Sequence, residues 1–143
     1  MSREIKAPRA WYKPLGVMIQ PEHVESINFD TKTIGVYLNM DGRGYHRLRL
    51  SDFELMWPTG RKDRNSKAIY DVDVLKVPDL YETPENTVTT YHTETVRWEG
   101  GAFLLGDEPM FHDADYISDA CEVIGNIHDN PELLQPQGGG KGE

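Results

Sequence analysis

Cysteine is almost missing from this sequence, because Cys121 is the only one among 143 residues. A single thiol can form neither an internal disulfide nor a zinc site built from several thiolates, and a reducing compartment suits such a chain. The sequence also lacks an uninterrupted apolar run of the roughly 18 residues that a membrane helix needs. Its polar beginning has no apolar segment of the signal-peptide type. We therefore expect a soluble, cytoplasmic protein that has no membrane partner.

Positive charge is scarce in the second part of the chain. Residues 77–143 contain 2 Lys and Arg against 14 Asp and Glu, whereas residues 1–76 contain 13 against 10, and the net charge is −9. A strongly acidic segment repels phosphate backbones, so nucleic acid is not an expected partner of this part. The acidity fits a basic surface on a protein partner, or it serves to keep the protein in solution.

Long amphipathic helical patterns are missing too. The first 21 residues contain Pro8, Pro14, Gly16 and Pro21, which are too closely spaced for a helix interior, so short strands are predicted there. The β-branched and aromatic segments 33–39 and 44–50 flank the turn residues Asp41-Gly42 and predict a hairpin with a bulge near Gly44. Residues 51–57 fit either one helical turn capped by Ser51 or a short strand.

The second half alternates between β-like segments and turn signals. We predict a solvated loop over 59–66 with a tight turn at Asn65-Ser66, and a strand with one irregularity over 67–77. A hairpin is predicted from 87–98 and 102–105, a helical turn over 115–121 and a buried strand over 121–127. Trp57 and Trp98 are expected to serve the core. The fold class is therefore mainly β, with small antiparallel strands and little helix.

Catalytic signatures are absent from the sequence. It has no Gly-rich phosphate loop, no GxSxG, no CxxC and no HExxH. Cys121 lies in an apolar run beside Glu122, and both features raise the pKa of a thiol, so it is not an expected nucleophile. The histidines are scattered singly and are expected to be exposed or at the edge of the core: His23, His46, His92, His112 and His128. We expect no enzyme activity and no cofactor.

Acidic residues gather around one histidine in the second half. His112, Asp113, Asp115 and Asp119, with Glu108 nearby, have the residue types and spacing of a divalent-metal site, but they match no metal-binding motif. A solvated acidic loop is the alternative, and no metal site is predicted. The three aspartates are candidate contacts for a basic partner.

Basic residues gather in one place only. The candidate binding residues there are a cluster of four cations with an aromatic residue on either side, namely Trp57, Arg61, Lys62, Arg64, Lys67 and Tyr70. Such a segment fits contact with phosphate or with an acidic protein surface. The alternative is a solvated turn whose charge protects a sheet edge.

Three stretches of the chain resemble the YopX-like family of phage and prophage proteins. The first combines residues 3–6 with Arg9-Ala-Trp11 and Met18-Ile19, and the second runs from Leu55-Met56 through Asn65 to Asp73-Val74. The third combines residues 96–103 with 122–127 and 130–134. The resemblance implies a mostly β fold with an SH3-like barrel in the C-terminal half and a phage or prophage origin. The resemblance supplies no activity and no catalytic residues that could be transferred to this chain, because the family has no agreed biochemical function.

The chain departs from the family pattern at two turns. Asn65-Ser66 stands where the family usually has Asn-Gly, and Asp71-Val72-Asp73 stands where it usually has Glu-Gly-Asp. A positive φ at either position would be strained without glycine. On the same resemblance we expect one domain over 1–134, with a possible subdivision near 51–58 into an N-terminal β part and the barrel. The composition of the last residues, with Pro136 and three consecutive glycines, predicts a disordered tail over 135–143.

Two functions of different kinds remain open. In the first, a phage-encoded protein without catalytic activity binds a host or phage protein through its acidic surface, for instance to block the basic groove of a host defence or nucleic-acid enzyme. In the second, an oligomeric module binds a small molecule or nucleotide through Trp57, Arg61, Arg64 and Tyr70. A metal-dependent hydrolase is a third and weaker hypothesis. A homo-oligomer is compatible with the open edges of small β domains.

Overall fold

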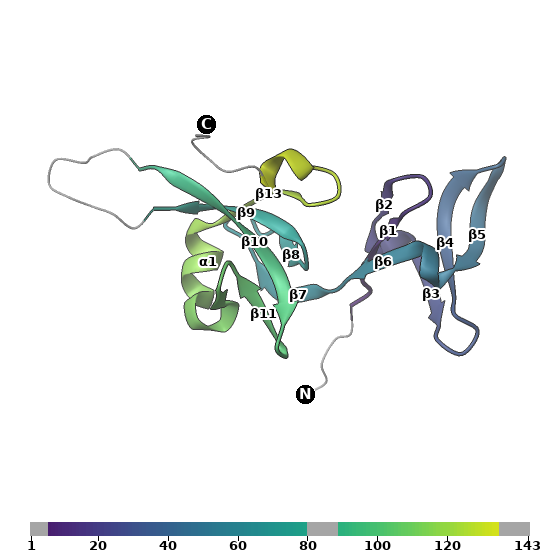
Figure 1. Ribbon diagram of the computed structural model, residues 1–143, viewed down its shortest axis with the longest axis horizontal. Helices are drawn as coiled ribbons and strands as arrows, with labels where there is room; N and C mark the ends of the chain where they lie inside the picture. Colours follow the sequence, from purple (N-terminus) through teal and green to yellow (C-terminus); the bar gives the residue numbers. More distant parts are fainter. Residues whose placement is uncertain (1–5, 80–88, 135–143) are drawn as a thin grey trace, which may run out of the picture. The chain divides into compact units, whose positions relative to one another are not determined.

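The computed structural model describes residues 6–79 and 89–134 of the chain (Figure 1). The chain divides into two compact units, residues 1–58 and 59–143, called here the N-terminal and C-terminal units. The N-terminal unit has 8 Lys and Arg against 7 Asp and Glu, and the C-terminal unit has 7 against 17. The acidity of the protein therefore belongs to the C-terminal unit. Among the described residues, no helix has the length and apolar character to cross a membrane.

The N-terminal unit is built from two three-stranded antiparallel sheets. One has the order β2-β1-β6 and consists of β1 (Arg9–Tyr12), β2 (Val17–Ile19) and β6 (Phe53–Met56). The other has the order β3-β4-β5 and consists of β3 (Val24–Asn28), β4 (Thr33–Met40) and β5 (Arg43–Arg49). The 3₁₀ helices η1 (Pro21–His23) and η2 (Leu50–Asp52) connect them. One apolar core, with Ile34 and Val36 fully buried, lies between these elements.

Most sequence predictions for the N-terminal unit are confirmed. The hairpin β4–β5 turns at Asp41-Gly42, and its register shifts between Tyr37 and Met40, so the irregularity lies across from the predicted position near Gly44. Residues 50–56 contain both of the alternatives that the sequence left open, a helical turn followed by a strand.

The C-terminal unit contains a five-stranded antiparallel sheet and a two-stranded one. The larger sheet has the order β12-β11-β10-β9-β13, with β9 (Asp73–Pro78), β10 (Tyr91–Glu99), β11 (Ala102–Leu105), β12 (Glu108–Pro109) and β13 (Glu122–Asn126). The smaller pairs β7 (Pro58–Lys62) with β8 (Ala68–Tyr70). The helices are η3 (Met110–Asp113), α1 (Ala114–Ala120) and η4 (Pro131–Leu134).

The core of the C-terminal unit lies under α1 and η3. Met110 and Ile117 from these helices pack with Leu75, Val96 and Leu105 of the sheet, which alternation along each strand turns toward one face. The mainly β, antiparallel fold predicted from the sequence is thus confirmed, as are the short helix before β13 and the hairpin β10–β11.

The prediction of a solvated loop over 59–66 is wrong. Residues 59–62 belong to β7, and Asp63 is buried with 3% of its surface exposed. Its carboxylate accepts hydrogen bonds from three backbone amides, those of Asn65 and Lys67 at 2.9 Å and that of Val123 at 2.8 Å. A charged run looks like a solvated loop in sequence, but one of its members is the internal acceptor around which the turn forms.

In each of the two turns where this chain lacks the family's glycine, the residue at that position has a left-handed backbone conformation. Ser66 has φ of 64° and Val72 has φ of 63°. The Val72 backbone is held on both sides, since its amide donates to the carbonyl of Val96 and its carbonyl accepts from the amide of Ile127. A β-branched residue in this conformation is strained, as the sequence comparison with the family indicated.

Replacing Asp63 is expected to destabilise the C-terminal unit strongly. Asp63→Ala leaves three backbone amides without their acceptor, and we expect the free energy of unfolding to fall by about 2–4 kcal/mol. Urea unfolding followed by far-UV circular dichroism measures this loss. Asp119→Ala removes an exposed carboxylate from α1 and serves as the control. Equal stability of the two variants would contradict the structural role of Asp63.

Relieving the strain at Val72 is expected to stabilise the protein. Val72→Gly removes the Cβ from a left-handed position, and after the entropy of glycine in the unfolded chain is subtracted we expect a gain of about 0.5–1 kcal/mol. Val72→Ala is the matched control, because it shortens the side chain but keeps the Cβ at positive φ. A Val72→Gly protein that melts below Val72→Ala in a thermal scan would show that the strain is not significant.

Candidate functional site

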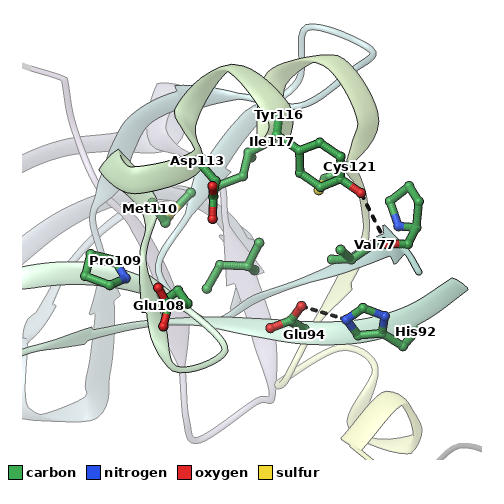
Figure 2. A pocket seen from close by; sticks show the side chains of 12 residues that line it. Val77, His92, Glu94, Glu108, Pro109, Met110, Asp113, Tyr116, Ile117 and Cys121 are labelled. Atoms are coloured by element: carbon green, nitrogen blue, oxygen red, sulfur yellow. Dashed lines mark hydrogen bonds and ion pairs between the residues drawn. The ribbon is translucent and has the colours of Figure 1, made fainter. Parts of the chain in front are cut away.

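A pocket of about 400 Å³ opens on the helix-covered face of the C-terminal unit. It lies between the strands β9, β10 and β11 on one side and η3 and α1 on the other (Figure 2). Its depth is apolar and is formed by Val77, Leu105, Met110, Ile117 and the half-buried Pro109. Its polar lining comes from five separate elements or their ends: His92, Glu94, Glu108, Asp113, Tyr116 and Cys121.

Carboxylates are the dominant charge of this pocket. Glu94 comes from the middle of β10, Glu108 from the first residue of β12 and Asp113 from the end of η3 (Figure 2). Among the residues that the structure describes, no Lys or Arg lines the pocket, and His92 is the one lining group that can carry positive charge. An apolar depth with an acidic lining favours a ligand that is both apolar and cationic.

His92 is held between two carboxylates. Its Nδ1 lies 2.6 Å from Oδ1 of Asp79, and its Nε2 lies 2.7 Å from Oε2 of Glu94. Partial burial of the ring lowers the pKa of His92, but the hydrogen bonds and charges of Glu94 and Asp79 outweigh this and raise the pKa above its ordinary value. The Asp79 carboxylate has a lowered pKa, because Thr90 and then His92 donate to it. Both ring nitrogens donate when the imidazole is protonated.

Glu94 also packs closely against a glycine. Gly106, in the turn between β11 and β12, has φ of 64°, and a Cβ at this position would overlap the Glu94 carboxylate. The Gly106 amide donates to the carbonyl of Thr95, which fixes the turn against β10. The positive φ therefore favours glycine at this position, and the missing Cβ leaves room for the Glu94 carboxylate where it lies.

Cys121 and Tyr116 close the inner end of the pocket. Burial, followed by the nearby charges of Glu94 and Asp113, raises the pKa of the Cys121 thiol to about 11. Burial also raises the pKa of Tyr116, whose hydroxyl donates to the carbonyl of Pro78 at 3.2 Å. With these pKa values both groups are neutral at physiological pH. The raised thiol pKa agrees with the sequence prediction, but the nearby charges that contribute to it are those of Glu94 and Asp113 and not that of Glu122.

The structure separates the predicted acidic residues. Asp113 lines the pocket, whereas Asp115 and Asp119 are exposed on α1 and do not line it. His112 lies 3.6 Å from Glu108 through its Nδ1. Within residues 6–79 and 89–134, no group of three or more His, Cys, Asp or Glu side chains is placed to hold a metal ion. Sequence reasoning missed the part played by His92 and Glu94, although their spacing of two with buried Val96 indicates a shared face of β10.

The four predicted basic residues share the β7–β8 hairpin, but they differ in exposure. Arg61 is half-buried on β7, Lys62, Arg64 and Lys67 are exposed, and Tyr70 is half-buried at the end of β8. Trp57 belongs to the N-terminal unit, with 43% of its surface exposed. The prediction that Trp57 and Trp98 serve the core is wrong, since Trp98 is 56% exposed at the end of β10.

A second, shallower hollow of about 300 Å³ lies in the C-terminal unit. Arg61 and Thr59 of β7 line it together with aromatic residues of the β10–β11 hairpin and η3, so the full lining is Thr59, Arg61, Trp98, Gly101, Ala102, Phe103, Met110 and Phe111. Met110 lines this hollow and the acidic pocket, so the two cavities are neighbours on one face.

The two carboxylates that hold the His92 ring, those of Asp79 and Glu94, are called here the clamp. The clamp predicts a specific dependence of the free energy of unfolding on pH. A raised pKa means that protonated His92 stabilises the fold fully below about pH 6.5, its value in the unfolded chain, and that this contribution is lost as pH rises through the folded-state pKa. The stability difference between the wild type and His92→Gln should therefore shrink from pH 6 toward pH 9. NMR titration of the His92 ring gives the pKa directly, and a value below 6.5 would contradict the clamp.

Comparison with known proteins supports one fold and one family. The family model described as YopX protein matches residues 8–135. Among solved structures, the chain is similar to the crystal structure of protein EF1440 from Enterococcus faecalis, with 23% identity, a TM-score of 0.61 and coverage of 93% of this chain and 100% of that chain. At this identity the likeness concerns the fold alone. No curated protein matches the chain significantly. Because the family model covers all but the ends of the sequence, the chain belongs to the YopX family.

Proposed function

We propose that this protein acts without catalysis, by binding a basic surface of a protein partner through the acidic pocket of its C-terminal unit. The observation that carries the proposal is the composition of that pocket: Glu94, Glu108 and Asp113 surround an apolar depth, and no Lys or Arg from the described part of the chain lines it. The excess of 17 acidic over 7 basic residues in the same unit extends the negative potential beyond the pocket.

A lysine or arginine of a partner has the chemistry that this pocket accepts. The aliphatic stem of either side chain packs on apolar residues such as Leu105 and Ile117, while the charged end remains at a polar opening. Glu108 and Asp113 are exposed and able to meet that charge. Glu94 is half-buried and already shares one oxygen with His92, so it adds charge at shorter range. Steering by the acidic face accelerates encounter with a basic partner.

The state of the titratable groups supports a binding role over a catalytic one. The His92 ring uses both nitrogens on carboxylates, which leaves no nitrogen for proton transfer with a ligand. The Cys121 thiol, with a pKa of about 11, is a poor nucleophile at neutral pH.

The fold of the C-terminal unit and the source of the partner are part of the same proposal. We infer an SH3-like barrel for the C-terminal unit from the way β10 pairs with β9 over its first half and with β11 over its second, as in a sheet that bends round on itself. The partner is a protein of the bacterial host or of a phage, met in the cytoplasm, and blocking a basic groove is the mode of action that the acidic face supports.

Charge reversal at the pocket tests the proposal. Wild-type protein and the double variant Glu108→Lys/Asp113→Lys are used as baits in bacterial lysate treated with nuclease, at low and physiological salt, and captured proteins are identified by mass spectrometry. We expect the wild type to retain a stoichiometric basic protein whose capture falls with salt, and the double variant to lose at least about tenfold of it, since each close charge pair contributes more than 1 kcal/mol.

Asp115→Lys/Asp119→Lys is the matched control, because it reverses the same number of charges on neighbouring α1 outside the pocket. This control should lose far less of the partner than the pocket variant. Equal losses would show that the general acidity of the unit, and not the pocket, makes the contact. Unchanged capture by the pocket variant would overturn the proposal.

A further inference from the structure

The second hollow differs in chemistry from the acidic pocket beside it. Two of its lining residues, Trp98 and Phe111, expose 56% and 62% of their surface, although aromatic side chains of this size are usually covered. Trp98 packs edge-on against Phe103, with ring centroids 4.8 Å apart, so one face of the indole has a fixed orientation. The hollow thus offers rigid aromatic surface to a flat ligand.

Arg61 brings positive charge to the edge of this aromatic surface. It is half-buried on β7, where the Thr59 hydroxyl accepts from its backbone amide at 3.1 Å and donates to the carbonyl of Ile69 at 2.9 Å. Arg61 forms no ion pair with another residue in the part of the chain that the structure describes. A half-buried guanidinium beside aromatic rings suits a carboxylate or a phosphate, since it can donate two parallel hydrogen bonds to either group.

The local charge agrees with an anionic ligand in spite of the acidic unit around it. The hairpin of β7 and β8 contains Arg61, Lys62, Arg64 and Lys67. Its single carboxylate, Asp63, is buried and bound to backbone amides. The screening length of physiological salt is about 8 Å, so acidic residues farther than this from Arg61 contribute little to the potential around its guanidinium.

We propose that this hollow binds a nucleoside monophosphate, with the base stacked on Trp98 and Phe111 and the phosphate held by Arg61. A volume of about 300 Å³ lies at the lower end of the range for small-ligand pockets, which fits one nucleotide. Stacking on tryptophan is favourable for every base because each has a π face, so the site selects for a nucleotide and not for one base. The hollow adjoins the acidic pocket, with which it shares Met110, but it offers a different chemistry from the one proposed to bind a protein partner.

Isothermal titration calorimetry of the full chain with AMP, adenosine and inorganic phosphate tests the proposal. We expect AMP to bind more tightly than either of its parts, since only AMP uses the aromatic surface and the guanidinium together. Arg61→Gln should weaken the binding of AMP by about tenfold or more, because a hydrogen bond to a charged group is lost. The affinity for adenosine should be unchanged. Trp98→Ala should weaken AMP and adenosine to a similar extent, also by about tenfold.

Lys62→Gln is the matched control for charge, because Lys62 follows Arg61 on the same strand but does not line the hollow. Its effect on AMP should be smaller than twofold. Arg61→Lys keeps the positive charge but loses the paired N–H donors of the guanidinium, so it should bind AMP with intermediate affinity. It provides a second variant should Arg61→Gln fold poorly. No heat with AMP at millimolar concentration, equal affinity for AMP and adenosine, or equal losses in Arg61→Gln and Lys62→Gln would each overturn the proposal.

Discussion

The buried carboxylate of Asp63 is the constraint on which the C-terminal unit depends. It fixes the turn between β7 and β8 through the amides of Asn65 and Lys67, and it reaches the first residues of β13 through the amide of Val123. The amide of Arg64 donates to the carbonyl of Cys121, which joins the same two segments again. Because α1 ends directly before Cys121, these bonds also hold the helix over the sheet. Both hollows therefore rest on one turn of the chain.

Alternation along β10 arranges the functional face above this anchor. Residues 92, 94, 96 and 98 share one side of the strand, so the clamped histidine and its carboxylate lie at one end, Val96 is buried in the middle and Trp98 is exposed at the other end. Met110 covers the middle and lines both cavities. The acidic pocket and the aromatic hollow with its guanidinium therefore both lie along one side of β10 and share Met110 in their lining.

Local sequence signals predicted many elements of this fold, but the single strand predicted over 67–77 is wrong, since this segment forms β8 and β9 in different sheets with a turn between them. β-Branched residues beside Asp41-Gly42 and Gly100-Gly101 marked two hairpins, and the shared face of Tyr116 and Ile117 marked α1. The segment 59–66 was wrongly predicted as solvated, because composition does not tell an exposed aspartate from one that accepts three backbone hydrogen bonds. That distinction depends on Val123, a partner far away in the chain. The strands and turns are thus local information, whereas the buried polar contact between them is not.

The candidate site was less predictable, for a related physical reason. Trp57 is a sequence neighbour of the basic residues but belongs to the other unit, while Trp98 joins Arg61 only through the tertiary fold. Asp113, Asp115 and Asp119 look like one cluster, yet the pocket takes only the first and draws its other carboxylates from β10 and β12. Charge along a sequence therefore predicts the long-range potential that steers a partner, which varies slowly with position. A binding pocket depends on side chains within a few ångströms of each other, and only strand register and helix placement determine which residues those are.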